Sequence, residues 1–98
     1  MPQSEEDPVV RVSLPAMLAE RVGNRLTMSA HGETVREVIS TLDETFPGLR
    51  FNLCLETGDL RPFVNIFVNG QNVRYLRGLD TVVAPGTTLH ILPSVAGG

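Results

Sequence analysis

The sequence predicts an α+β fold in which one mixed sheet of four to five strands wraps over one main helix. Two observations carry this prediction. Short segments in which apolar and polar residues alternate lie on both sides of a single segment with helical spacing. A lone helix with one apolar face needs a sheet to cover that face. With 98 residues, 42% of them hydrophobic, the chain is expected to form one domain.

The first two elements are predicted to be strands joined as a hairpin. Apolar and polar residues alternate from Val10 until Pro15 ends the pattern, which is typical of a half-buried strand. Residues 16–25 are interpreted as a connector that turns at Gly23-Asn24. A second alternating segment follows. The side chains expected to face the core from these two strands are Val10, Val12, Leu14, Leu26, Met28 and Ala30.

The main helix is predicted to begin at Thr34. Thr34 and Glu37 form a T-x-x-E capping box, whose side chains can accept hydrogen bonds from the unpaired amides of the first turn. The helix should end at Pro47-Gly48. Its expected apolar face is Val35, Val38, Ile39, Leu42 and Phe46, and its expected polar face is Arg36, Glu37, Ser40, Asp43 and Glu44.

The second half of the chain is predicted to add the remaining strands. Residues 49–61 are expected to be irregular. After Pro62 the sequence FVNIFVNG alternates as a strand and ends in Asn69-Gly70, a pair that favours a tight hairpin turn. The elements expected after this turn are a short strand at 72–75, a turn-rich packing segment at 79–83, a turn at 84–87, and a last strand at 88–92 that ends at Pro93.

The two ends of the chain are expected to lie outside the folded domain, which spans residues 8–93. Residues 1–7 include three consecutive acidic residues and are predicted to be a disordered leader. This segment lacks the apolar region of a signal peptide. No apolar run reaches the roughly 18–20 residues of a membrane span. We therefore expect a cytoplasmic protein that does not bind membranes and is monomeric on its own.

The composition excludes several classes of function. The net charge is −3 and the arginines form no basic stripe, so the surface that binds nucleic acid is missing. A domain of this size leaves little volume for a deep pocket of roughly 300–1,000 Å³. No motif places a nucleophile beside His31 or His90, and Cys54 is interpreted as a small core residue. We therefore expect no enzymatic activity, no metal site and no bound cofactor.

The strongest functional signal is the end of the chain. After the last strand come Ser94, Val95, Ala96, Gly97 and Gly98, which are small and uncharged in their side chains. Five extended residues span about 17 Å. Terminal glycines add no stability to a fold, because ordering them costs conformational entropy. We therefore predict a flexible tail, residues 94–98, that offers an unhindered carboxylate at Gly98 and is narrow enough to enter the tunnel of another protein.

Several motifs of this chain resemble the ubiquitin-like β-grasp sulfur carriers, the family of the molybdopterin-synthase small subunit and the thiamine sulfur carrier. The similar segments are FVNIFVN at 63–69, Val-Arg at 73–74 and ILPSVAGG at 91–98. The run Thr-Leu-His at 88–90, followed by the terminal di-glycine, also resembles ubiquitin. Within the family the likeness is strongest to the mycobacterial carrier for cysteine biosynthesis, and it covers most of the chain from about Val10.

The resemblance implies a route for sulfur that runs through Gly98. A ubiquitin-activating-type enzyme would use ATP to adenylate this carboxylate, and a sulfur donor would then displace AMP to leave a thiocarboxylate. The implied acceptor is a pyridoxal-phosphate cysteine synthase, with later release by a metal-dependent peptidase. The ATP, sulfur donor and other cofactors belong to these partners and not to this chain. Molybdopterin or a sulfur-containing secondary metabolite are alternative destinations for the sulfur.

Two other classes of function stay open. One is a protein modifier that is conjugated through Gly98 to lysines of other proteins. The chain has no lysine, so it offers no side-chain amine for conjugation to itself. The other is a passive adaptor in which the two terminal glycines have no role. Intact-mass analysis separates sulfur carriage from conjugation, and deletion of Gly97-Gly98 tests the adaptor.

Strand alternation also predicts a docking surface at the root of the tail. Two positions of the last strand should face the helix, so His90 and Leu92 must point the other way. By the same parity Phe67 is turned away from the helix. We expect Phe67, His90 and Leu92 to form an exposed patch to which the activating enzyme docks. The alternative is that the segment 50–61 covers Phe67.

Overall fold

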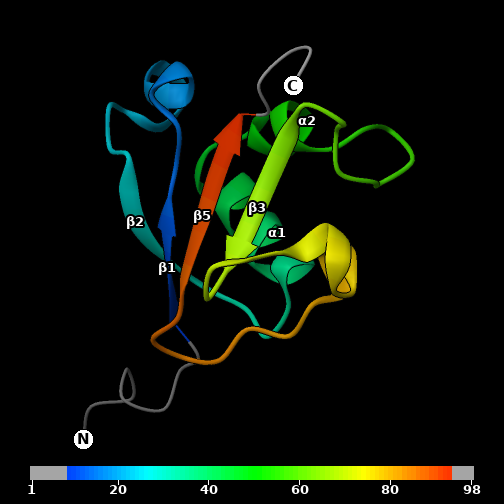
Figure 1. Cartoon of the computed structure of the whole chain (residues 1–98). Helices are drawn as coiled ribbons and strands as arrows, with labels where there is room; N and C mark the ends of the chain where they lie inside the picture. The colour runs from blue at the N-terminus through cyan, green and yellow to red at the C-terminus, as the bar shows by residue number, and fades with distance from the viewer. Residues whose placement is uncertain (1–8, 94–98) are drawn as a thin grey trace, which may run out of the picture.

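The computed structural model describes residues 9–93, and these form one five-stranded mixed sheet packed against two α-helices (Figure 1). The strand order is β2-β1-β5-β3-β4. β1 and β5 are parallel, and the other neighbouring strands are antiparallel. The strands are β1 (Val9–Ser13), β2 (Thr27–His31), β3 (Val64–Val68), β4 (Gln71–Asn72) and β5 (Thr88–Pro93), and the α-helices are α1 (Val35–Thr45) and α2 (Leu49–Leu53).

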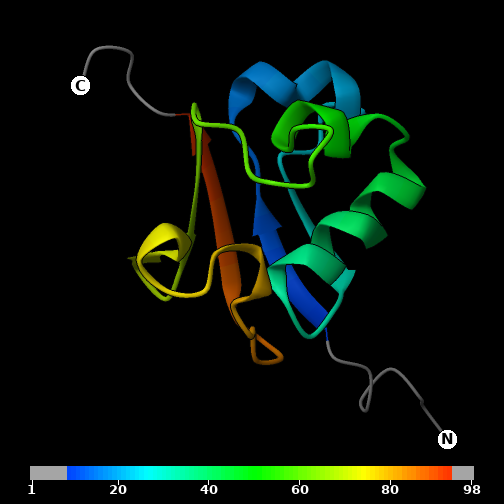
Figure 2. The same ribbon diagram turned by 90° about the vertical axis from the view of Figure 1, so that its right-hand side faces the viewer.

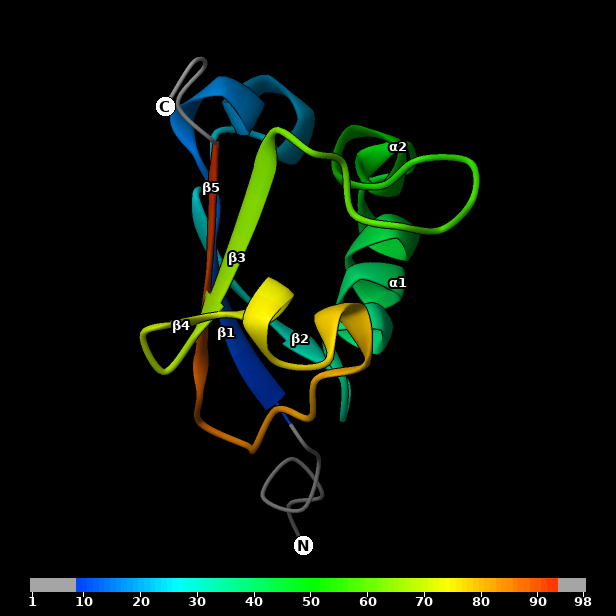
Figure 3. The same cartoon turned by 45° about the vertical axis from the view of Figure 1, so that its right-hand side comes forward.

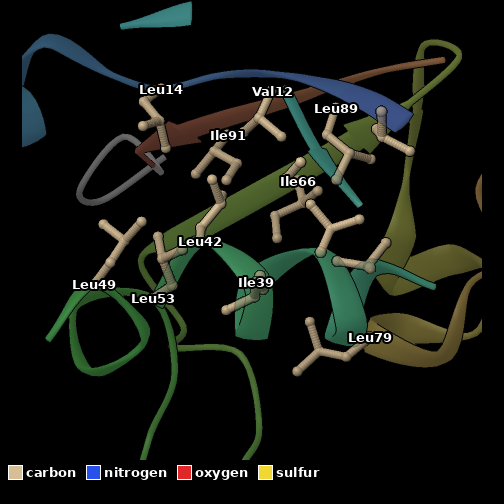
Figure 4. Packing of buried hydrophobic residues seen from close by; sticks show 14 of the residues in the cluster. Val12, Leu14, Ile39, Leu42, Leu49, Leu53, Ile66, Leu79, Leu89 and Ile91 are labelled. Atoms are coloured by element: carbon tan, nitrogen blue, oxygen red, sulfur yellow. The ribbon is translucent and has the colours of Figure 1, made fainter. Parts of the chain in front are cut away.

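The core lies between one face of the sheet and the helices. Figure 2 shows α1 and α2 on the same side of the sheet. In Figure 4 the side chains of Val12, Ile66 and Ile91 point from the strands toward those of Ile39 and Leu42 on α1. All five are at most 2% exposed. Burial of one such side chain contributes roughly 1.5–3 kcal/mol. The apolar positions predicted from strand alternation are therefore the positions that face the core.

The first hairpin and the main helix agree with the sequence prediction. Val10 and Val12 are fully buried on β1, and Ala30 is buried opposite Val10 on β2. The backbone amide of Glu37 donates a 3.2 Å hydrogen bond to the Thr34 hydroxyl, which confirms the N-cap. The return bond differs from a capping box, because the Glu37 carboxylate accepts from the amide of Glu33.

Three predicted segments are wrong in detail. Residues 16–25 are not a plain connector, because Ala16–Val22 forms a 3₁₀ helix, η1, that buries two of its side chains. Residues 49–61 are not wholly irregular, since they begin with α2. The predicted strand at 72–75 is only the two-residue β4, followed by a 3₁₀ turn, η2 (Val73–Tyr75). A further 3₁₀ turn, η3 (Gly78–Asp80), overlaps the start of the predicted packing segment at 79–83.

Within residues 9–93 the structure contains no helix that is long and apolar enough to cross a bilayer. The expected cytoplasmic location stays a prediction. The expected leader at residues 1–7 lies outside the described residues.

Candidate functional site

The candidate site is the end of β5, from which the C-terminal tail continues. β5 lies in the middle of the sheet, between β1 and β3 (Figure 1). Its last residue, Pro93, lies opposite Val64 of β3. The predicted tail residues Ser94, Val95, Ala96, Gly97 and Gly98 lie outside the described residues. The structure therefore defines where the tail begins and which side chains surround its root.

The side chains of β5 alternate as the sequence predicted. Leu89 and Ile91 are buried under the helices, whereas His90 is exposed and Leu92 is 45% exposed. Because Leu89 and Ile91 are fixed in the core, β5 cannot slip by one residue without exposing them. The core therefore determines which residues lie at the root of the tail.

The predicted docking patch is brought together on the outer face of the sheet, away from the helices. Phe67 and His90 are direct cross-strand neighbours, and Leu92 lies opposite Asn65, one step along the same face. Phe67 is half-buried, so it is less exposed than expected. The segment 50–61 does not cover it, because α2 and the loop after it lie on the helix side of the sheet (Figure 3).

The open edge of β3 is closed by an arginine. β4 pairs only with Phe67 and Val68, so the beginning of β3 has no neighbouring strand on that side. The Arg74 guanidinium reaches across the gap and donates to the carbonyls of Arg61 and Val64, both at 2.6 Å. Its Nε also lies 3.4 Å from Asn65 Oδ1. Arg74 thus supplies hydrogen bonds to the edge of β3 that has no neighbouring strand.

Cys54 is a core residue in this fold. It is only 4% exposed, and burial raises the pKa of its thiol, which opposes formation of a thiolate. The thiol also borders an open cleft of about 660 Å³ beside α1 and α2, so the expectation that this chain leaves little room for a pocket was too strict. The described lining of this cleft includes arginines and carboxylates but no histidine that could pair with the thiol.

The two histidines do not form a catalytic pair. His31 ends β2 and His90 lies on β5, and β1 separates these two strands. Across residues 9–93 no cluster of three or more histidine, cysteine or acidic side chains is placed to hold a metal ion.

Sequence reasoning missed two exposed apolar residues close to the tail root. Met17 of η1 and Phe63, just before β3, line a groove that also includes Leu92 and Pro93. The sequence predicts only a connector over residues 16–25, which gives no reason to single out Met17. Its position on a short helix that follows Pro15 could have drawn attention to it.

Comparison with known proteins links this architecture to a defined group. The pattern of the ThiS family matches residues 12–98. The chain is 42% identical over 91 residues to the sulfur carrier protein CysO of Mycobacterium tuberculosis, which covers 91% of this chain and 98% of the relative.

Two solved structures show the same fold at sequence identities well above chance. A chain in the crystal structure of the Amycolatopsis orientalis BexX/CysO complex is 39% identical, with a TM-score of 0.84, covering 91% of this chain and 99% of that one. The small archaeal modifier protein 1 of Methanosarcina acetivorans is 34% identical, with a TM-score of 0.78, covering 94% and 98%. These relatives confirm the ubiquitin-like β-grasp fold expected from the sequence.

Proposed function

The chain belongs to the ThiS family, and from this premise we propose that it is a sulfur carrier whose C-terminal Gly98 bears the sulfur as a thiocarboxylate. The observation that carries the proposal is its 42% identity to the sulfur carrier CysO along nearly the whole chain. The similar mycobacterial proteins are named sulfur carrier proteins, and the same carrier role without catalysis is part of this proposal. The chemistry therefore falls to partner enzymes, and the chain supplies the acyl group.

The chemistry follows from the carboxylate at the end of the tail. An α-carboxyl group has a pKa of about 3.3–3.7 and is ionised at neutral pH. Its oxygen attacks the α-phosphorus of ATP on the activating enzyme, and pyrophosphate leaves. The resulting acyl-adenylate carries a good leaving group, so a sulfur donor at the oxidation level of sulfide (HS⁻) attacks the carbonyl carbon, AMP departs, and the S–H proton is lost to solvent. Gly98 then ends in a thiocarboxylate, a soft nucleophile that delivers sulfur to an acceptor.

The partners are part of the same proposal. An adenylating enzyme binds ATP and the sulfur donor, and this chain binds no cofactor of its own. A complex of BexX with a related CysO supports the idea that such carriers act by binding another protein. We favour a pyridoxal-phosphate cysteine synthase as the sulfur acceptor, because the sequence is so similar to CysO. A metal-dependent peptidase would release the product. Molybdopterin or a secondary metabolite are the alternative destinations.

The central test is loading of the full chain by an adenylating enzyme with ATP and a sulfur donor. Intact-mass analysis should show exchange of one oxygen for sulfur at the C-terminus. Deletion of Gly98, or addition of one alanine after it, should abolish loading and leave the melting temperature unchanged, because β5 ends before the tail begins. Thiocarboxylate formation in the shortened chain would contradict the proposal.

A second candidate function is protein modification through Gly98. The likeness to small archaeal modifier protein 1 favours it, and it shares the adenylation step. Mass analysis of the chain recovered from its native cells distinguishes the two. Sulfur carriage predicts a free chain with a C-terminal thiocarboxylate, whereas modification predicts conjugates of higher mass on lysines of other proteins.

We also propose that Phe67, His90 and Leu92 form the docking patch for the activating enzyme. Phe67→Ala combined with Leu92→Ala should raise the KM for the carrier and leave folding nearly normal, since both side chains lie on the outer face of the sheet. Tyr75→Ala is the matched control, because Tyr75 is 86% exposed and lies outside this patch. Unchanged activation of the double variant, or its unfolding, would contradict the assignment.

A further inference from the structure

A second apolar surface lies at the tail root, on the helix side of the sheet. It is a groove of about 470 Å³ between η1 and the segment that leads into β3. Its floor includes the buried side chains of Leu18, Leu53 and Ile91. Figures 1 and 3 both show η1 at the end of the sheet where β5 ends. The groove therefore begins where the folded domain gives way to the tail.

The rim of this groove is unusually apolar for a surface. Met17 is 72% exposed and Phe63 is 68% exposed, and Leu92, which is 45% exposed, also lines the groove. Side chains this exposed add little to the stability of the fold. Methionine and aromatic residues are enriched at the centres of protein interfaces, where they fill irregular spaces on a partner. The arrangement is therefore typical of a binding surface.

The charge around the groove has one sign. Arg21 and Arg61 contribute guanidinium groups, and Asn52 contributes an amide. Arg61 is held in place because its Nε donates a 2.7 Å hydrogen bond to the carbonyl of Phe51. No aspartate or glutamate is found among the lining residues that belong to the described part of the chain. On a chain of net charge −3 this local positive charge favours an acidic partner.

The position of the groove limits what can cover it. Pro93 forms part of its wall, and only five residues separate Pro93 from the carboxylate of Gly98. Five extended residues span at most about 17 Å. An enzyme that takes Gly98 into its active site must therefore bring its own surface close to this end of the domain.

We propose that the groove is a docking site for the adenylating enzyme, which inserts an apolar side chain between Met17 and Phe63 and places acidic residues against Arg21 and Arg61. This inference rests on the proposed function and adds to it a contact that shares only Leu92 with the patch on the outer face. The two surfaces meet at Leu92. An enzyme that binds both surfaces would contact the root of the tail from both sides of the sheet.

The test compares matched variants in steady-state adenylation, measured as AMP or pyrophosphate release with the full chain as substrate. Met17→Ser combined with Phe63→Ser should raise the KM about tenfold, as expected when interface anchors are removed, and leave kcat unchanged because the tail is intact. Tyr75→Ser is the control for loss of an exposed apolar side chain. Melting curves of both variants verify that each is folded.

The charge component is tested with Arg21→Glu, and Arg77→Glu is the control for a charge reversal elsewhere. Arg21→Glu should raise the KM and make the KM less dependent on salt concentration, because the attraction that salt screens has been removed. Arg77→Glu should change neither the KM nor its salt dependence. A folded Met17/Phe63 variant with the wild-type KM overturns the groove assignment. If the same variant keeps the wild-type KM for adenylation but transfers sulfur to the acceptor more slowly, the assignment is also overturned, because the acceptor enzyme then binds in the groove. If the wild-type chain is never adenylated, the proposed function itself fails.

Discussion

Arg74 should contribute more to the free energy of unfolding than is usual for an exposed arginine. It donates from one guanidinium nitrogen to two backbone carbonyls at the open edge of β3, those of Arg61 and Val64. Replacement by methionine keeps most of the aliphatic length and removes every donor. The Arg61 carbonyl keeps its 3.0 Å hydrogen bond from the Val64 amide, but water has to satisfy the Val64 carbonyl, and β3 loses the group that substitutes for a neighbouring strand.

The size of the effect follows from the two short bonds. A hydrogen bond to a charged group contributes roughly 1.5–3 kcal/mol when it is protected from water. Because Arg74 is exposed, we discount the pair and expect Arg74→Met to lower the free energy of unfolding by about 1–2 kcal/mol in total. For a domain of this size that corresponds to a melting temperature lower by roughly 4–16 °C.

Urea unfolding followed by circular dichroism measures this difference. Arg77→Met is the matched control, because Arg77 is also exposed and the hydrogen bonds found for it are made by its backbone, whose amide donates to the Thr81 hydroxyl and whose carbonyl accepts from the Asp80 amide. Arg74→Lys should be intermediate, since an ammonium group keeps the charge but lacks the planar fork of donors. If Arg74→Met is as stable as Arg77→Met, the proposed closure of the β3 edge is wrong.

Three further predictions concern the helix start and the core. Gly32→Ala should lower the free energy of unfolding by about 2–4 kcal/mol, because residue 32 has a φ of +157° and its new Cβ would lie 2.7 Å from the backbone nitrogen of Val38. A decrease below about 1 kcal/mol, measured by the same urea unfolding, would refute this. Thr34→Ala should cost about 1 kcal/mol, and Thr34→Ser should restore it, since either hydroxyl can accept from the amide of Glu37. Cys54→Ala should load sulfur like the wild type, and loss of loading in a folded Cys54→Ala chain would show that the thiol takes part in loading. In the wild-type chain, iodoacetamide should modify Cys54 more slowly in the folded state than in urea, because burial raises the pKa of its thiol.

The strands and the main helix were predictable because each has a periodic signal within a few residues. Alternation placed Val12 and Ile91 in the core, and the spacing of four apolar residues from Val35 marked the buried face of α1. Asn69 and Gly70 both adopt positive φ angles, as their turn requires. Such patterns depend only on residues that are close together in the sequence, so they can be recognised without knowing the fold.

The missed elements are short and depend on the rest of the fold. η1 spans seven residues and α2 spans five, too few for a clear helical period. Their buried residues do repeat four apart, at Leu18 and Val22 and at Leu49 and Leu53, and that spacing was the available signal. β4 stops after two residues because the Asn72 side chain accepts from the amide of Arg74 and starts a 3₁₀ turn.

One part of the candidate site could be predicted from the sequence and another part could not. The parity of β3 and β5 predicted that Phe67, His90 and Leu92 share one face, and the register confirms this. The groove beside Met17 could not be predicted, because it needs η1 and the segment before β3 to lie together. Those two segments are far apart in the sequence, and only the completed fold brings them to the same end of the sheet.

The central place of β5 has a consequence for how the chain is made. Without β5, the β1–β2 hairpin and the β3–β4 hairpin share no strand pairing, and a two-stranded ribbon alone is only marginally stable. Since β5 is the last of these strands to leave the ribosome, the two halves cannot join during most of synthesis. Chains truncated before residue 88 should therefore remain unfolded and open to proteolysis.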